Sequence, residues 1–346
     1  MPKAKQRRSV VIPSIFVTPT ADNSGERTAP TQDAATVAQH LLDGDRRALA
    51  RAITFVENGD AIGGEIVAQL YPHTGHASFL GFTGAPGVGK SSLLGAVIRH
   101  LRHDADTRVG VISVDPSSPF TDGALLGDRI RLTEHFLDRN VFIRSMSTRG
   151  HLGGLSEATL QTALLLDAFG MDEVLLETVG VGQSEVEISR IADTTVLVLM
   201  PGSGDSVQAL KAGIMEIPDI IVINKCDHPA AHELRQQIRS VLTLSKREWT
   251  PPIVETQALS GQGIDRLWES VREHRNWLGE DSRLEQRRRR SLELEVLSLA
   301  AARAAREVRA RVDDDPRLRE LLEQMHAREL DPLTCTTRLF EEVFTS

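Results

Sequence analysis

The chain has 346 residues, 40% of them apolar and 25% charged, which suits one large domain with appendages or two domains. Forty basic and 48 acidic residues leave a net charge of −8, which argues against a polyanion such as DNA as the main partner. No apolar run approaches the roughly 20 residues of a membrane-spanning helix, and two cysteines cannot form a disulfide framework. We therefore expect a cytoplasmic protein that binds neither nucleic acid nor membrane.

The first 31 residues differ in composition from the rest of the chain. Basic residues precede an apolar patch at Val10–Val17, which Pro13 interrupts, and a polar stretch follows. Because such a segment can bury little apolar surface, we predict a flexible tail over residues 1–31. Asp22 and Glu26 count against a mitochondrial transit peptide.

Helical spacing begins after this tail. Apolar residues at i, i+3, i+4 and i+7 predict an N-terminal helical extension over residues 32–75, which Pro72 and Gly75 close. The residues with this spacing are Leu49, Ala52, Ile53 and Val56.

Short β-branched apolar runs alternate with helical patterns over residues 76–278. Several runs are apolar throughout, which is typical of parallel strands covered on both faces. The alternation predicts an α/β domain whose mostly parallel sheet is flanked by helices. The predicted strands are Ser78–Thr83, Val109–Val114, Val141–Arg144, Glu173–Glu177, Thr195–Met200, Ile220–Asn224 and Ile253–Thr256.

The last part of the chain is predicted to be a helical arm over residues 279–346. Asp315-Pro316 and Asp331-Pro332 each place a proline at the first position of a helix. A long helix precedes them and opens with Arg287–Arg290. Because acidic residues follow closely, we interpret these arginines as a solvated helix face rather than as a nucleic-acid site.

The strongest motif follows the first predicted strand. It reads Gly-Ala-Pro-Gly-Val-Gly-Lys-Ser, the full phosphate loop G-x-x-x-x-G-K-S between a strand and a helix. Its glycines let backbone N–H groups turn toward a phosphate, Lys90 reaches the β- and γ-phosphates, and the Ser91 hydroxyl ligates Mg²⁺. The predicted phosphate-binding residues are Gly84, Pro86, Gly87, Val88, Gly89, Lys90, Ser91 and Ser92.

A second motif, Asn224-Lys225-Cys226-Asp227, indicates the base. The Asp227 carboxylate can accept hydrogen bonds from N1–H and the 2-amino group of guanine, whereas adenine would leave it unpaired. We therefore predict GTP and GDP as ligands, bound by Asn224, Lys225 and Asp227. Farther on, Ala258 and Leu259 lie where guanine-binding proteins place a Ser-Ala-Leu or Ser-Ala-Lys loop, although Gln257 departs from that pattern.

Three acidic residues could hold the metal ion. Asp115 and Glu177 follow buried strands, and carboxylates at that position can bind Mg²⁺ directly or through water. Asp128 lies on the intervening segment, where a solvated helix cap is the alternative.

The residues at the position where signalling GTPases activate the attacking water differ from the usual pattern. Val181 follows Gly180, where signalling GTPases carry a glutamine that orients the attacking water, and Gln183 lies two positions later. We therefore predict slow intrinsic hydrolysis that depends on a partner. The stretch from Gly202 to Lys211 is either a mobile loop near the nucleotide or a plain strand–helix connection.

Taken in order, these motifs resemble the methylmalonyl-CoA mutase-associated GTPases of the MeaB/ArgK type, a SIMIBI-class P-loop family. The resemblance runs from about Thr36 to the C-terminus, and its most specific part is Glu-Thr-Val-Gly-Val-Gly-Gln-Ser-Glu from Glu177. It implies a P-loop GTPase core and a C-terminal arm that forms a homodimer. It also implies a chaperone that gates cofactor loading into an adenosylcobalamin-dependent acyl-CoA mutase and protects that mutase.

The resemblance also implies roles for individual residues. It places Mg²⁺ on Ser91, Asp115, Asp128 and Glu177, and it makes Lys211 a candidate for catalytic contact beside Lys90, Glu177 and Gln183. Asp122 departs from the family pattern, where glycine is common.

Two other functions compete with the chaperone. A kinase associated with amino-acid transport would need ATP and a phosphoryl acceptor, and Asp227 argues against ATP. A metallochaperone GTPase would need a Cys or His cluster near the phosphate loop, which the sequence lacks.

Overall fold

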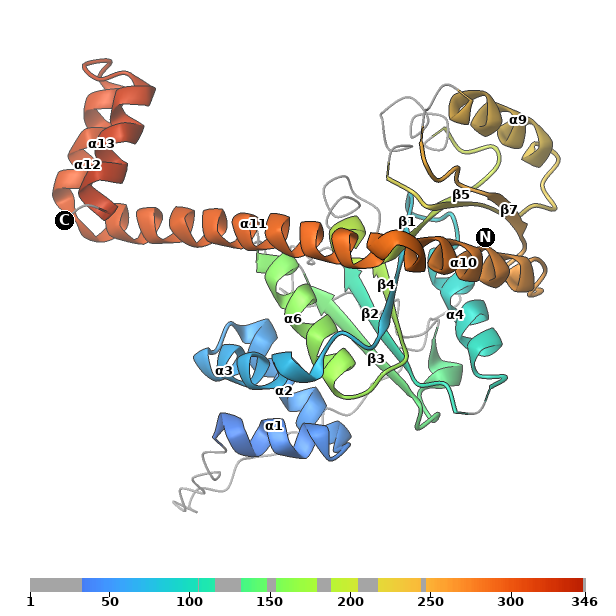
Figure 1. Ribbon diagram of the computed structural model, residues 1–346. Helices are drawn as coiled ribbons and strands as arrows, with labels where there is room; N and C mark the ends of the chain where they lie inside the picture. The colour runs from blue at the N-terminus through green and yellow to red at the C-terminus, as the bar shows by residue number, and fades with distance from the viewer. Residues whose placement is uncertain are drawn as a thin grey trace, which may run out of the picture. The chain divides into compact units, whose positions relative to one another are not determined.

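The computed structural model describes residues 33–104, 106–115, 132–147, 154–178, 188–204, 217–243 and 247–344. The predicted tail at residues 1–31 lies outside them. Seven parallel strands form one sheet in the order β3-β2-β4-β1-β5-β6-β7, as predicted for an α/β fold (Figure 1). The strands are β1 (Ser78–Thr83), β2 (Val109–Asp115), β3 (Val141–Ser147), β4 (Glu173–Thr178), β5 (Thr194–Leu199), β6 (Ile220–Asn224) and β7 (Ile253–Thr256).

All seven predicted strands are present, and three match the prediction at both ends. The strand predicted to end at Arg144 continues to Ser147, because β3 pairs with β2 in parallel register as far as Asp115 and Ser147. Strand β5 begins and ends one residue earlier than predicted. Pairing along the edge of a neighbouring strand, which sequence does not report, sets these boundaries.

Helices cover both faces of the sheet. On one face, α4 (Lys90–Leu101) and α10 (Ile264–Gly279) share a core with the strands. On the other face, α6 (Gly154–Ala168) packs on the sheet and carries the N-terminal helices. The other helices of this part are α1 (Ala34–Leu42), α2 (Arg46–Asn58), α3 (Ala61–Leu70) and α9 (Ala231–Leu242), with short 3₁₀ turns at Tyr71–His73, Thr133–His135 and Glu280–Ser282.

Helix α2 shows why the N-terminal helices form. The Asp45 side chain caps its first turn by accepting a hydrogen bond from the Arg47 backbone N–H, and Gly59 ends it in the left-handed conformation. The four residues that predicted this helix, Leu49, Ala52, Ile53 and Val56, are all buried in the core shared with α6.

Three helices form the C-terminal part: α11 (Arg283–Asp314), α12 (Pro316–His326) and α13 (Pro332–Phe344). The two proline-led helices begin where the sequence predicts them. Helix α11 contacts α10 and α6 near its start, and α12 and α13 pack against each other and against α11 (Figure 1). Within the described ranges, no helix is both long and apolar enough to cross a membrane.

The arginine run at the start of α11 is not a solvated face, and that interpretation was wrong for two of its members. Arg287 makes a two-point ion pair with Asp219, at 3.0 and 2.8 Å, and Arg288 makes one with Asp193, at 2.7 and 2.6 Å. Arg288 also donates to the backbone carbonyl of Ala77. These carboxylates stand at the amino ends of β5 and β6, so α11 is fastened to the sheet at that edge.

Removing one of these pairs should destabilise the fold. We expect Arg288→Ala to lower the free energy of unfolding by about 3 kcal/mol, because the Asp193 carboxylate, 5% exposed, would lose its counter-ion and keep only the hydrogen bond from the Phe79 backbone N–H. Arg289→Ala is the matched control, since Arg289 is 83% exposed and pairs with the exposed Glu293, and we expect a change within about 0.5 kcal/mol. Urea denaturation of both variants measures the difference, and equal losses would contradict the assignment.

A buried histidine lies at the same edge. His274 of α10 packs against the rings of Trp249 and Trp277, which also contact each other, and its Nδ1 is 2.9 Å from the Thr194 hydroxyl. Burial is the main cause that lowers the pKa of His274 from 6.5 to about 4, although the Asp219 carboxylate opposes the shift. The imidazole is therefore neutral in the folded protein at neutral pH.

This lowered pKa makes stability depend on pH. The stabilising contribution is complete above pH 6.5, the ordinary value, and is lost as pH falls toward 4, at up to about 1.4 kcal/mol per pH unit. The charged groups that face His274 are Asp219, Asp193, Arg287 and Arg275. We expect His274→Asn to flatten the stability curve between pH 6.5 and 4, as measured by urea denaturation at several pH values. A variant curve parallel to the wild type would rule this out.

Candidate functional site

The predicted site residues that lie within the described ranges gather at the carboxyl edge of the sheet. The phosphate loop joins the end of β1 to the start of α4, and β1 is a central strand between β4 and β5. In open parallel sheets, ligands bind at such an edge where successive connections leave for opposite sides. The ends of β2, β4, β6 and β7 bring the acidic and base-binding residues to this same edge.

Two glycines of the loop are required by its geometry. Gly84 has φ +140°, and a Cβ there would come within 2.2 Å of the Val198 carbonyl oxygen on β5. Gly89 has φ +95°, and a Cβ there would meet the Asn224 side-chain amide nitrogen at 2.4 Å. The loop therefore lies directly against two neighbouring segments, and a side chain at either position would displace it.

Lys90 is buried at the first position of α4. Its ammonium group donates hydrogen bonds to the backbone carbonyls of Gly84, at 2.6 Å, and Ala85, at 2.9 Å. The side chain thus arches back over the loop that would hold the phosphates. A bound nucleotide would offer phosphate oxygens at the same place, and these are stronger acceptors for an ammonium group than neutral carbonyls.

Two side chains at this edge, those of Ser91 and Glu177, have oxygen atoms that suit a metal ion. The Ser91 hydroxyl donates to Glu177 Oε1 at 2.7 Å, and both side chains are buried. Hydroxyl and carboxylate oxygens are the hard ligands that Mg²⁺ prefers, so this pair fits the ion. Glu177 lies opposite Ser113 in the β2–β4 register, which puts the backbone of Asp115 at the same edge, two residues farther along β2.

Asn224 connects the phosphate loop to the predicted base-binding loops. Its side-chain nitrogen donates to the Val88 carbonyl at 2.9 Å, and its oxygen accepts from the Ala258 N–H at 3.2 Å. Lys225, at φ 54°, extends over the loop and donates to the Gly87 carbonyl at 3.1 Å. The asparagine is buried, so its own two contacts are shielded from water, whereas the Lys225 contact is exposed.

The remaining base-binding residues lie around this link. Asp227, the predicted partner of the base, is exposed, and Leu259 is 87% exposed while Ala258 is buried. Burial raises the pKa of the Cys226 thiol, and the nearby carboxylates Glu255 and Asp227 raise it further, so this cysteine stays protonated at neutral pH.

Two contacts to this link were missed by sequence reasoning. The Thr256 hydroxyl donates to Asn224 Oδ1 at 3.2 Å, and the sulfur of Met200 accepts from Lys225 at 2.9 Å. Both residues lie at or just past the carboxyl end of a predicted strand, and that position was the available signal. Their residue types carried none, because threonine and methionine are common in strands and cores.

Several predicted residues are outside the described part of the chain. These are Asp128, Gln183 and Lys211, together with the departure at Asp122. Pro86, Gly87 and Ser92 belong to the loop and the first turn of α4, with Pro86 and Gly87 exposed. Among the described residues, no group of three or more His, Cys, Asp or Glu side chains could hold a metal ion.

The contact between Gly89 and Asn224 gives a test of this architecture. We expect Gly89→Ala to lower the free energy of unfolding by about 2 kcal/mol, through strain at positive φ and a clash with the Asn224 amide, and to weaken GDP binding. Gly64→Ala in α3 is the control, because a Cβ there meets nothing within 4 Å, and it should stabilise by up to about 1 kcal/mol. Urea denaturation and GDP titration measure both, and wild-type behaviour of Gly89→Ala would contradict the packing described.

Comparison with known proteins agrees with this geometry. The family described as methylmalonyl Co-A mutase-associated GTPase MeaB matches residues 49–313. A protein of Pyrococcus horikoshii that is classed as a GTPase is 45% identical over 310 residues, which cover 88% of this chain and 96% of the relative. The mouse protein methylmalonic aciduria type A homolog, mitochondrial, is 36% identical over 253 residues, covering 67% of this chain and 61% of its own length.

A solved structure supports the same assignment. The crystal structure of an LAO/AO transport system kinase is 30% identical, has a TM-score of 0.69, and covers 90% of this chain and 97% of its own. The resemblance read from the motifs is thus confirmed over most of the sequence. The chain belongs to the family of methylmalonyl-CoA mutase-associated GTPases, and it is a P-loop GTPase that binds guanine nucleotides.

Proposed function

We propose that this GTPase is a chaperone of an adenosylcobalamin-dependent acyl-CoA mutase. It gates loading of the cofactor and protects or reactivates the mutase, and methylmalonyl-CoA mutase is the favoured client. The observation that carries the proposal is the family match over residues 49–313, because the family is described by its association with that mutase. The name of the mouse relative refers to methylmalonic aciduria, which favours the same client.

In this proposal, GTP is held by the loop from Gly84 to Ser92 and by the base motif. Mg²⁺ would be held by Ser91, Asp115, Asp128 and Glu177, and when bound it would neutralise charge that develops on the phosphate oxygens. The 2.7 Å contact between Ser91 and Glu177 supports the assignment of those two. Lys90 would exchange its loop carbonyls for phosphate oxygens, and so stabilise the same charge.

Hydrolysis is proposed to be slow until the mutase binds. Lys90 and Glu177 form the buried part of the catalytic group, and Gln183 and Lys211 are the candidates for contact with the attacking water or the γ-phosphate. Val181 replaces the glutamine that signalling GTPases use for this purpose, which supports dependence on a partner.

The arm over residues 279–346 is proposed to form a homodimer. Several large apolar side chains of α11 and α13 are exposed, which favours a protein partner for these helices. They are Leu294, Val296, Leu297, Leu333, Phe340 and Phe344. We further propose that residues 32–75 and 76–278 act as helical extension and GTPase domain, and that the protein works in the cytoplasm.

The alternative is a kinase associated with amino-acid transport. It is favoured by the name of the 30% identical protein of known structure, an LAO/AO transport system kinase. A kinase would transfer the γ-phosphate to a protein or small acceptor, whereas the chaperone transfers it to water. The two functions therefore differ in where labelled phosphate appears.

The test is GTP turnover by the pure protein, alone and with candidate cobalamin-dependent mutases. We expect one mutase to raise turnover by about tenfold or more, because groups supplied by a partner can complete a GTPase site. Lys90→Ala should abolish both the basal and the stimulated reaction, which shows that the activity belongs to this chain.

Radiolabelled γ-phosphate separates the outcomes. Release as free phosphate with stimulation by a mutase supports the chaperone, whereas transfer from ATP to an acceptor supports the kinase. Turnover that no mutase changes would contradict the proposed partner and leave the GTPase assignment standing.

A further inference from the structure

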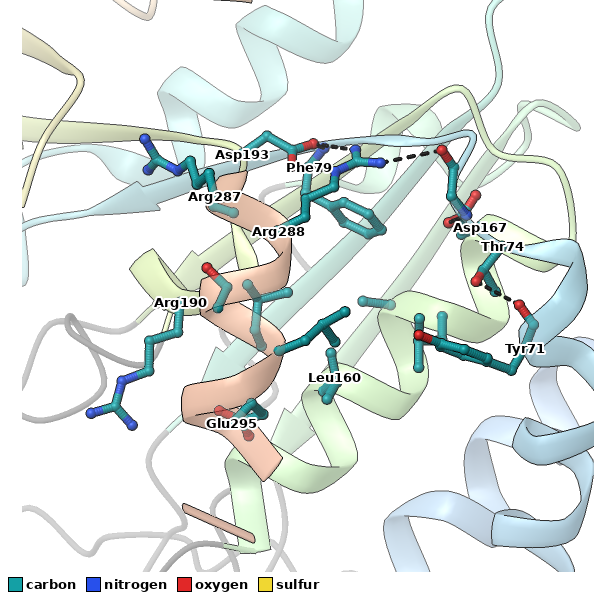
Figure 2. A pocket seen from close by; sticks show the side chains of 17 residues that line it. Tyr71, Thr74, Phe79, Leu160, Asp167, Arg190, Asp193, Arg287, Arg288 and Glu295 are labelled. Atoms are coloured by element: carbon teal, nitrogen blue, oxygen red, sulfur yellow. Dashed lines mark hydrogen bonds and ion pairs between the residues drawn. The ribbon is translucent and has the colours of Figure 1, made fainter. Parts of the chain in front are cut away.

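A cavity lies on the edge of the sheet opposite to the nucleotide site. Its volume is about 150 Å³, and it is lined by residues of α6, α11, the Tyr71–Gly75 segment, the amino end of β1 and the segment that precedes β5 (Figure 2). Phe79, near the start of β1, faces this cavity, whereas the phosphate loop follows the other end of the same strand. The cavity is therefore separate from the site described above.

The wall of the cavity is mostly apolar. Two aromatic rings, from Tyr71 and Phe79, face side chains of α6 and α11 (Figure 2). Arg288 covers the ring of Phe79 at 5.6 Å from its centre, so this ring is held in place by the ion pair with Asp193. The apolar wall residues are Tyr71, Phe79, Leu160, Ala163, Leu164, Ile191, Ala192 and Leu292.

The charged groups around the cavity are already neutralised. Asp167 accepts three backbone hydrogen bonds, from Gly75, His76 and Ala77, at 2.6, 3.1 and 2.8 Å. Asp193 and Arg288 of the wall pair with each other, and Arg287 of the wall pairs with Asp219. Since these groups have their partners, they offer none to a charged ligand, which would lose its hydration without compensation.

Two other charged residues of the wall, Arg190 and Glu295, also offer no partner to an anionic ligand. The Arg190 side chain extends away from the cavity (Figure 2). Glu295, at the far end of the wall, is 2% exposed, and its buried carboxyl group disfavours an anion. Because the wall is mostly apolar and the carboxylates of Asp167 and Asp193 already have their partners, an uncharged ligand matches it best.

Volume then limits the size of the ligand. An apolar cavity of about 150 Å³ is large enough to bind benzene or xenon. We propose that this cavity is a binding site for a small uncharged apolar molecule, of the size of one aromatic ring or a short branched hydrocarbon. It is a second ligand site, independent of the nucleotide site and of the proposed mutase partner.

The position of the cavity predicts which part of the protein a bound ligand would stabilise. Its walls come from the end of the helical extension, from α6 of the GTPase domain and from the first turns of α11. A molecule that packs against all three stabilises the contact between the arm and the sheet. Bound ligand should therefore slow hydrogen exchange in the first turns of α11, at residues 287–295.

Benzene is the probe for the full-length protein. We expect a saturable rise in the melting temperature and slower exchange at residues 287–295. Ser291→Phe, at a half-buried residue that lines the cavity, should abolish both effects. Ser298→Phe is the matched control, since Ser298 is half-buried two turns later on α11 and is not part of the lining, and it should keep both.

Two further measurements test the proposal even if the Ser291→Phe variant fails to fold. Leu160→Ala enlarges the cavity and should allow indole to bind, which is too large for the wild type. Benzoate, a charged ring of similar size, should bind the wild type about tenfold more weakly than benzene.

Specific outcomes would overturn the proposal. Absence of a saturable benzene effect in the wild type would do so, and so would an effect that Ser291→Phe retains. Tighter binding of benzoate than of benzene would show that the ligand is anionic. Exchange that slows elsewhere and not at residues 287–295 would show that benzene binds at another place.

Discussion

The buried side chain of Asn224 holds together the two halves of the nucleotide site. Its amide reaches the phosphate loop at Val88 on one side and the loop at Ala258 on the other. The absence of a side chain at Gly89 leaves the space in which this amide lies. The loops that are predicted to bind the phosphates and the base are therefore parts of one hydrogen-bonded unit.

The parallel pairing of the strands brings the residues of this hydrogen-bonded unit together. Because every strand of the sheet runs in the same direction, all strands end at one edge, and residues far apart in sequence meet there. Glu177 is 86 residues from Ser91 along the chain and still lies within hydrogen-bond distance of it. The helices on both faces keep the strands buried up to the edge where the polar groups converge.

The amino edge of the sheet, opposite the nucleotide site, holds helix α11 in place. There, two partly buried arginine–aspartate pairs fasten α11 to the amino ends of β5 and β6, and the buried His274 is neutral beside two tryptophan rings. Buried ion pairs contribute little net stability compared with apolar contacts, but they impose one geometry, because each partner is costly to leave alone. The start of the arm is thus fixed in direction relative to the sheet, and the apolar cavity beside it takes its shape from the same contacts.

The fold class, the seven strands, the phosphate loop and the family could all be predicted from the amino-acid sequence, because they follow from local periodicity and from motifs whose spacing is intrinsic to the chain. The proline-led helices α12 and α13 were predictable for the same reason. The roles of Arg287 and Arg288 depend instead on three-dimensional packing, since their partners Asp219 and Asp193 lie 68 and 95 residues away and no local pattern indicates such a pair. The same holds for the link through Asn224 and for the cavity, because both arise where separate segments pack together, and packing across long sequence distance leaves no periodic trace.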